Sequence, residues 1–182
     1  LGIGDSFWTV TLFRSVSATE MEPLGMDLDL LDPALLQVSK VTSNSIVDRY
    51  NQTVPEEKQI QAGDFILQVN RITGEATAMA DQLAAPTAER FTLTLQRPTW
   101  QRVCLTGLGR EQELRHVLTS LQRSDASLYV TRRVLGVNGL RRHDRIMAVD
   151  DVQGDLHDAI GAALSRGEPF EVSVARPGVE AE

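Results

Sequence analysis

Residues 60–74 read Ile-Gln-Ala-Gly-Asp-Phe-Ile-Leu-Gln-Val-Asn-Arg-Ile-Thr-Gly, and residues 140–154 read Leu-Arg-Arg-His-Asp-Arg-Ile-Met-Ala-Val-Asp-Asp-Val-Gln-Gly. The two stretches align without a gap. In both, a first apolar residue is followed at the same spacings by Asp, Ile, Val, an Asn or Asp, and a closing Gly. Self-similarity of this kind is typical of a repeated structural unit. The alignment therefore predicts two related domains.

A second repeated pattern lies downstream of each stretch. Residues 91–98 read Phe-Thr-Leu-Thr-Leu-Gln-Arg-Pro, and residues 170–177 read Phe-Glu-Val-Ser-Val-Ala-Arg-Pro. Each follows a short Ala-rich segment, and its alternation of apolar and polar residues predicts a β-strand. We place the boundary between the domains near Pro98, which gives a first domain over residues 1–98 and a second over 99–182.

Composition removes several classes of protein. The chain has 182 residues, 42% of them apolar and 24% charged, and a net charge of −7. No apolar run approaches the roughly 18 residues that a membrane span needs. The single cysteine, Cys104, excludes an internal disulfide and a thiolate zinc cage. The acidic balance argues against nucleic acid as a partner, since binding to phosphates needs a positive field. We expect an intracellular protein, soluble or peripheral to a membrane.

The first domain has the pattern of a mainly β fold with short α-helices, an α+β class. Alternation or apolar runs predict strands over residues 7–14, 26–30, 36–42, 65–70 and 90–96. Ser45 is placed to cap a short helix that runs through Asn51. A second helix is predicted over residues 77–85, where Pro86 stops it. Strands at such short spacing favour a small sandwich or a partly open barrel.

Taken in order, these pieces resemble a PDZ domain. The resemblance is carried by Pro23-Leu-Gly-Met26, residues 36–41, the helix that Ser45 caps, residues 60–70 and the terminal strand. It covers about residues 7–97, and residues 101–177 are similar to a degenerate PDZ-like repeat. The resemblance implies two PDZ-like, partly open β-barrels in tandem, a protein partner and no cofactor.

The resemblance also implies a peptide-binding groove in the first domain. Leu24, Gly25 and Met26 would direct backbone N–H groups at a terminal carboxylate, and the strand that begins at Met26 would add the peptide to its edge. The residues that would line the groove for an apolar side chain are Leu24, Met26, Leu28, Met79 and Leu83. No His stands at the start of the second helix, so an apolar ligand residue is expected two positions before the end.

The second domain departs from this pattern. Gly107-Leu-Gly-Arg110 suits the carboxylate loop, but residues 111–123 carry apolar residues at helical spacing where an edge strand is expected. We therefore expect this domain to dock on a partner and not to capture a peptide. Because Arg suits bidentate contact with carboxylates, the candidate docking residues are the arginines Arg132, Arg133, Arg141, Arg142 and Arg145.

Three functions remain. The first is a scaffold or adaptor that binds a C-terminal or extended segment of a partner. The second is a non-catalytic peripheral structural subunit of a larger assembly. PDZ-like repeats similar to this one occur in photosynthetic protists, which makes a plastid membrane complex one such assembly. An enzyme is disfavoured, because the motifs of common catalytic and metal sites are missing. Cys104 is expected to be a small buried residue of a strand. We predict no catalytic residue and no metal site.

Overall fold

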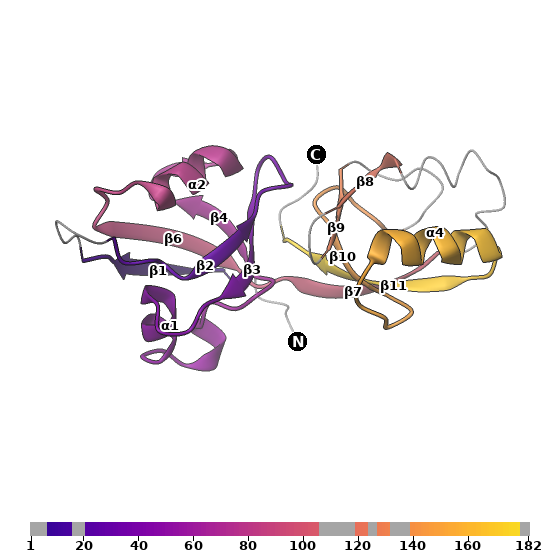
Figure 1. Cartoon of the computed structure of the whole chain (residues 1–182), viewed down its shortest axis with the longest axis horizontal. Coiled ribbons are helices and arrows are strands. Elements are labelled where there is room, and N and C mark those ends of the chain that lie inside the picture. Colours follow the sequence, from indigo (N-terminus) through magenta and orange to yellow (C-terminus); the bar gives the residue numbers. More distant parts are fainter. Residues whose placement is uncertain (1–6, 16–20, 106–118, 124–126, 132–138, 179–182) are drawn as a thin grey trace. The chain divides into compact units, whose positions relative to one another are not determined.

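The computed structural model describes residues 7–15, 21–105, 119–123, 127–131 and 139–178. The chain divides into two compact units, Leu1–Arg97 and Pro98–Glu182, here called unit 1 and unit 2 (Figure 1). Each unit contains its own antiparallel sheet and its own apolar core. Within the described ranges, no helix has the length and the hydropathy that a membrane crossing requires.

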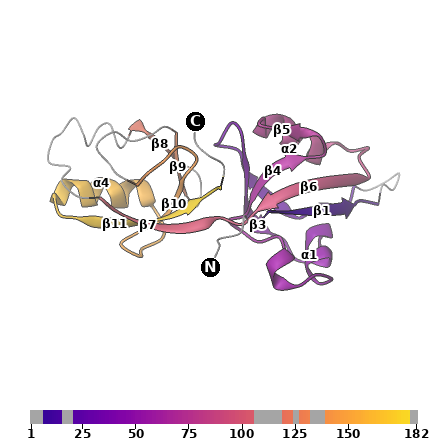
Figure 2. The ribbon, with the colours of Figure 1, turned by 180° about the vertical axis from the view of Figure 1, so that it is seen from behind.

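Unit 1 is a sheet in the order β1-β6-β4-β3-β2, with β5 paired to β4. Its strands are β1 (Phe7–Phe13), β2 (Met26–Asp29), β3 (Leu36–Val41), β4 (Phe65–Val69), β5 (Ile72–Thr73) and β6 (Arg90–Gln96). Its helices are α1 (Ile46–Asn51), the 3-10 turn η1 (Glu56–Lys58) and α2 (Ala76–Ala84). Figures 1 and 2 both show α1 and α2 on opposite sides of the β1–β6 pair. The predicted class, mainly β with short α-helices, is confirmed.

Local signals in the sequence account for the two helices. Ser45 caps α1: its Oγ accepts a hydrogen bond from the N–H of Asp48 at 3.2 Å. This bond satisfies one of the N–H groups that the first helical turn leaves without a partner. Helix α2 ends at Ala84, two residues before Pro86, which cannot donate a backbone hydrogen bond and restricts the residue ahead of it.

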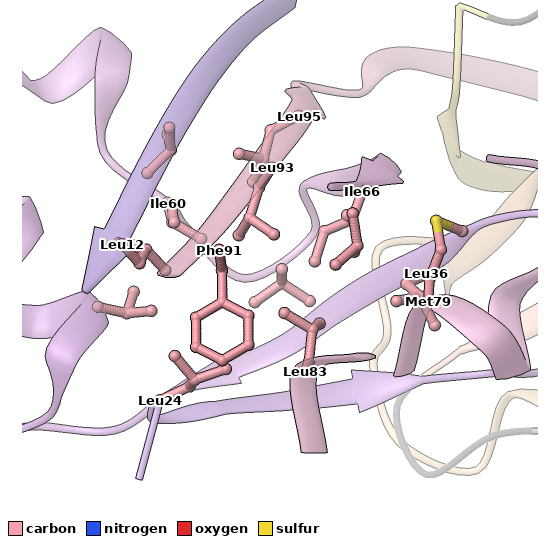
Figure 3. Close-up of a cluster of buried hydrophobic side chains, with 14 of the residues drawn as sticks. Leu12, Leu24, Leu36, Ile60, Ile66, Met79, Leu83, Phe91, Leu93 and Leu95 are labelled. Atoms are coloured by element: carbon pink, nitrogen blue, oxygen red, sulfur yellow. The ribbon is translucent and has the colours of Figure 1, made fainter. Parts of the chain in front are cut away.

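The core of unit 1 is formed by the inner face of the sheet together with residues of α1 and α2. Alternate residues of β1 and β6 enter it, which is the arrangement that their apolar alternation predicts. Figure 3 shows side chains of this cluster, among them Leu12, Leu36, Met79, Phe91 and Leu95. Leu24 and Leu83 also belong to the cluster, so one end of the core reaches the loop before β2 and the last turn of α2.

Unit 2 repeats the sheet of unit 1. Its strand order is β7-β11-β10-β9-β8, which corresponds strand for strand to the order of unit 1. The elements are β7 (Thr99–Leu105), β8 (Leu121–Arg123), β9 (Leu128–Val130), β10 (Arg145–Val149), α4 (Leu156–Arg166) and β11 (Phe170–Arg176). Helix α4 follows β10 as α2 follows β4 and β5, and its buried residues enter the core of unit 2.

The sequence repeat has the same structural role in both units. Asp64 and Asp144, which occupy matching positions in the two aligned stretches, are almost wholly buried. Each accepts two hydrogen bonds from an Arg at the end of the last strand of its unit: Arg97, the residue after β6, or Arg176, the last residue of β11. Each also accepts a backbone N–H from three residues upstream. The repeated Asp therefore ties the turn before one strand to the end of its neighbour.

The structure corrects two predictions for unit 2. The expected helix over residues 111–123 does not extend to its predicted end, because Leu121–Arg123 is strand β8 and pairs with β9. Unit 2 therefore has the strand that the helical spacing argued against. Cys104 is exposed and not buried: β7 directs it away from the core, while its neighbours Val103 and Leu105 point inward. The Gly107-Leu-Gly-Arg110 segment lies outside the described residues.

Candidate functional site

A pocket of 390 Å³ opens between β2 and α2 in unit 1. One wall is the loop that leads into β2 and the first residues of that strand. The opposite wall is the last turn of α2. The pocket is lined by Arg14, Met21, Pro23, Leu24, Gly25, Met26, Asp27, Leu28, Thr42, Ser43, Asn44, Ser45, Ala80, Leu83 and Ala84. The walls of the pocket are therefore the loop, the strand and the helix that the sequence analysis predicted to form a groove.

The loop before β2 is held by its carbonyl groups. Leu24 accepts a hydrogen bond from the N–H of Val47 at 3.0 Å, and Gly25 accepts one from Thr42 at 2.9 Å. The N–H groups of Leu24 and Gly25 donate no hydrogen bond to any of the described residues. Two N–H groups in succession at the mouth of a pocket are the kind of donors that bind a carboxylate.

Gly25 is required at its position for two reasons. Its φ is +80°, a conformation that side chains with a Cβ rarely adopt. A Cβ at this position would also lie 2.0 Å from both Cβ and Oγ of Ser45. Since Ser45 caps α1 and donates to the carbonyl of Thr42 at 2.7 Å, it has no room to move away. The close contact between loop and helix therefore depends on the glycine.

Strand β2 lies at the end of the sheet of unit 1. The carbonyl of Gly25 accepts a hydrogen bond from the N–H of Thr42, the residue after β3. The carbonyl of Asp27 accepts one from Oγ of Ser39 in β3 at 3.0 Å. Successive residues of a strand direct their main-chain groups to opposite edges. Met26 and Leu28 therefore present their main-chain groups away from β3, toward the open edge beside α2.

The apolar floor of the pocket differs in one residue from the prediction. Leu24 and Leu83 are buried, and Met26 and Leu28 are partly buried against the core. Met79 was expected to line the groove, but it is fully buried in the core and does not reach the pocket. The pocket side of α2 carries Ala80, Leu83 and Ala84 in its place. One residue along a helix turns the side chain by about 100°, which separates Met79 from its neighbour.

Arg14 lines the pocket as well, although sequence reasoning did not identify it. Its Nη2 donates to the carbonyl of Leu83 at 3.0 Å and its Nη1 to that of Ala85 at 3.0 Å. Its guanidinium lies 4.8 Å from the centre of the Phe91 ring. The side chain is buried, and its Nε has no hydrogen-bond partner. The position of Arg14 as the last residue of a predicted strand was the only available signal.

Charged side chains lie at the pocket and just before its loop. Glu22, two residues before Leu24, forms an ion pair with Arg49 in α1. Burial lowers the pKa of Arg14, and the negative charge of Glu22 acts in the opposite direction. Arg14 thus places a positive charge at the pocket, while the carboxylate of Glu22 is paired with a cation of its own.

The candidate docking arginines of unit 2 are not one surface. Arg145 is fully buried in β10, with its guanidinium 4.6 Å from the centre of the Tyr129 ring, so it cannot contact a partner. Arg141 and Arg142 are exposed in the turn before β10. Arg132 and Arg133 lie outside the described residues. Strand β10 lies inside the sheet between β11 and β9, and nearly all of its residues are buried, which the clustering of arginines in the sequence did not indicate.

Unit 2 has a pocket of its own beside β8 and α4, with a volume of 540 Å³. It is lined by Arg123, Ser127, Leu128, Gly154, Asp155, Leu156 and His157. Arg123 and Asp155 form an ion pair at 2.5 Å, which links the strand to the start of the helix. This pocket adjoins the N-terminal end of α4, whereas the pocket of unit 1 adjoins the C-terminal end of α2.

No family model matches the sequence, and no curated protein matches it. Among solved structures, the chain is similar to the PDZ45 pair of INAD in complex with an NG2 peptide. The identity is 18% and the TM-score 0.39, over 97% of this chain and 94% of that chain. It is also similar to the PDZ domain of choanoflagellate GIPC bound to a GAIP peptide. That match has 17% identity and a TM-score of 0.36, over 51% of this chain and 91% of that one. The second PDZ domain of Dlg1 from the choanoflagellate Monosiga brevicollis matches at 18% identity and a TM-score of 0.35, over 50% of this chain and 97% of that one.

In architecture the chain is a tandem repeat of one antiparallel β-sheet unit. Both units have the same antiparallel strand order, and both carry a helix after the strand that contains the repeated Ile and Val. In unit 1, the loop, the edge strand and the helix stand in the order that the sequence predicted.

Proposed function

We propose that unit 1 binds the C-terminal end of another protein in an extended conformation. The carboxylate lies at the loop of Leu24 and Gly25, and the main chain of the ligand continues along the open edge of β2. Strand addition of this kind combines main-chain hydrogen bonds, which give affinity, with side-chain pockets that give specificity. The side chain of the last ligand residue then enters the pocket over Leu24 and Leu83.

The observation that carries this proposal is the coincidence of three features in one pocket. The N–H groups of Leu24 and Gly25 have no partner among the described residues. The main chain of Met26 and Leu28 is directed outward beside them. The apolar floor of the pocket lies directly below. A free C-terminus in an extended conformation has a matching part for each feature: a carboxylate for the N–H groups, main-chain groups for the edge of β2, and a last side chain for the apolar floor.

Arg14 supports the same ligand. A buried cation beside the two N–H groups raises the local positive potential, which favours a carboxylate over a neutral end. The small side chains of Ala80 and Ala84 leave space for a bulky apolar residue at the end of the ligand. At the other end of α2, Ala76 offers no polar group, so an apolar ligand residue is also favoured two positions earlier.

The test is a binding titration of the whole chain with fluorescent peptides of eight residues that end in Leu. We expect saturable binding of the peptide with a free carboxylate, and at least tenfold weaker binding of the same peptide with an amidated end. The amide removes the negative charge but keeps the side chains. Equal affinity of the two peptides would show that the loop does not bind a carboxylate.

A variant at the pocket localises the binding. Ala80→Phe fills the space beside Leu83, so it should abolish binding of the free-carboxylate peptide. Ala78→Phe places the same side chain about 200° around α2 from Ala80, outside the pocket lining, and should leave the affinity unchanged. A thermal unfolding curve for each variant checks that the fold is kept. Unchanged binding by a folded Ala80→Phe variant would contradict the proposal and leave the docking subunit as the better account.

A further inference from the structure

We propose that the groove of unit 1 selects partner ends in which basic and apolar residues alternate. Lys or Arg would stand one and three residues before the end, with apolar residues at the end and two residues before it. The inference rests on the proposed function and adds the class of ligand. It derives from the two carboxylates that β2 carries between its apolar residues.

The register of an added strand follows from β2 itself. The residues of β2 alternate, with Met26 and Leu28 on the core face and Asp27 and Asp29 on the other face. A strand added antiparallel to β2 has directly opposed residues on the same face of the sheet. With the carboxylate at the loop, the residue before the last lies on the face of Asp27. The residue three before the end lies on the face of Asp29.

The side chains that β2 and β3 pair at these positions are more acidic than basic. In β3, Lys40 stands opposite Asp27, and both are exposed. The residue opposite Asp29 is Gln37, which is neutral. The paired positions of β2 and β3 thus carry two acidic side chains and one basic side chain. A basic residue on an added strand would extend the charge alternation from Lys40 through Asp27 to the ligand.

The field of the whole unit acts in the same direction. Residues 1–97 contain seven Lys and Arg against thirteen Asp and Glu. Long-range attraction therefore favours a basic ligand segment during the approach. The terminal carboxylate of the same ligand lies by Arg14 and the loop N–H groups. The basic side chains and the carboxylate of the ligand are therefore bound at different places.

The apolar positions of the ligand follow from the core face. The last residue enters the pocket over Leu24, Met26 and Leu83, and the residue two before it lies over Leu28. Acidic residues on the face of Asp27 and Asp29 would bring like charges opposite each other, which destabilises strand pairs. A ligand with acidic residues at these positions is therefore expected to be rejected, although its last residue fits.

The experiment compares three peptides on the whole chain by fluorescence anisotropy at low salt. All three end in a free carboxylate with Leu at the last position and two before it. The residues one and three before the end are Lys, Ala or Glu. We expect the Lys peptide to bind about tenfold more tightly than the Glu peptide, with the Ala peptide between them. The ratio should shrink as salt screens the exposed charges.

A variant pair identifies the residues that are responsible. Asp27→Asn together with Asp29→Asn should bring the three peptides to nearly equal affinity. Asn at position 29 can still accept the hydrogen bond that Asp29 receives from the N–H of Leu31 at 2.8 Å. Glu56→Gln together with Glu57→Gln removes the same charge from η1, which is not part of the groove, and should keep most of the preference.

The outcomes separate this inference from the proposed function. Equal binding of all three peptides by the unmodified chain overturns the inference and leaves carboxylate capture in place. An equal loss of preference in both double variants also overturns it, because the net charge and not β2 would then be responsible. If no free-carboxylate peptide binds, carboxylate capture is wrong and the inference is wrong with it.

Discussion

Arg97 holds Asp64 with two nearly parallel hydrogen bonds, from Nε to Oδ1 at 3.0 Å and from Nη2 to Oδ2 at 3.2 Å. Asp64 is almost wholly buried, and the same Nη2 also donates to the carbonyl of Gln59 at 2.6 Å. Burial raises the pKa of Asp64, and the hydrogen bonds from Arg97 and from the backbone act in the opposite direction. The buried negative charge of Asp64 is therefore compensated by a guanidinium group in a bidentate contact.

Arg97→Lys should destabilise unit 1 by about 2 kcal/mol. Lys cannot make both hydrogen bonds to Asp64, and removal of one partner leaves a buried charge poorly compensated. The loss stays below that for a fully buried pair because the side chain of Arg97 is 28% exposed. Urea unfolding measures it. Arg71→Lys, at an exposed position, is the control and should change the stability little. Equal stability of the two variants would show that the second hydrogen bond is dispensable.

Gly25→Ala should destabilise unit 1 by roughly 2–4 kcal/mol, from the left-handed backbone and the overlap with Ser45 together. Gly63→Ala isolates the first cause, since Gly63 has a φ of +96° but open space around it. It should cost only about 1 kcal/mol.

A double variant checks the overlap directly. Ser45→Gly removes the side chain that an added methyl would strike, and Gly costs little at a helix cap. Gly25→Ala should therefore be less damaging in a Ser45→Gly background than alone, as measured by denaturant unfolding. Strictly additive losses would contradict the steric explanation.

Arg14→Lys should loosen the last turn of α2 and weaken peptide binding by about tenfold. The carbonyls of Leu83 and Ala85 lie at the helix end, where Arg14 supplies donors that the helix itself lacks. Lys keeps the charge but loses the fork. Hydrogen exchange should be faster for the last amides of α2 and unchanged for those of β6. Arg90→Lys, whose Arg lies 6.0 Å from the ring of Phe13, is the control. Retained peptide affinity with a protected helix end would contradict this role.

Stability at acid pH should depend on Asp155, the N-cap of α4. The hydrogen bond from the N–H of Asp158 lowers the pKa of Asp155, and the nearby charge of Arg123 acts in the same direction. A carboxyl group with a lowered pKa in the folded state stabilises it above the ordinary pKa. That contribution is lost as the pH falls through the lowered value. Asp155→Asn still caps the helix but does not titrate, so its stability should fall less between about pH 5 and pH 2.

Denaturant unfolding at several pH values measures this difference. Glu56→Gln removes an exposed carboxyl group in unit 1 and should follow the unmodified chain across the same range. Parallel pH profiles for Asp155→Asn and the unmodified chain would show that the cap charge contributes nothing.

Much of unit 1 could be predicted from local patterns. Alternation along residues 7–13 and 90–96 defined two strands, Ser45 and Pro86 marked helix ends, and the Asp of residues 60–74 marked the turn before β4. These signals lie within a few residues of the element that they define. The loop with Gly25 and the edge of β2 were likewise predictable, because their order along the chain is the order in which they meet in the pocket.

The same local reasoning failed where a partner far along the chain made the choice. Residues 121–123 end a segment whose apolar residues recur at helical spacing, yet they form a strand that pairs with β9. Backbone hydrogen bonds between strands can outweigh such a local preference. Cys104 is exposed between two buried neighbours, and Arg145 lies among buried residues of β10, so only the packing of the sheet decides which side chains reach the interior.

The sequence alone determined the repeat, the elements of unit 1 and the residues of its loop, because each of these depends on spacing along the chain. The tertiary structure decided that Ala80 and not Met79 lines the pocket, and that Arg14 lines the same pocket as Leu24 and Gly25 with its donors on the end of α2. These contacts join residues about 70 positions apart. Their geometry is set by how the helix and the sheet pack, which no spacing in the sequence records.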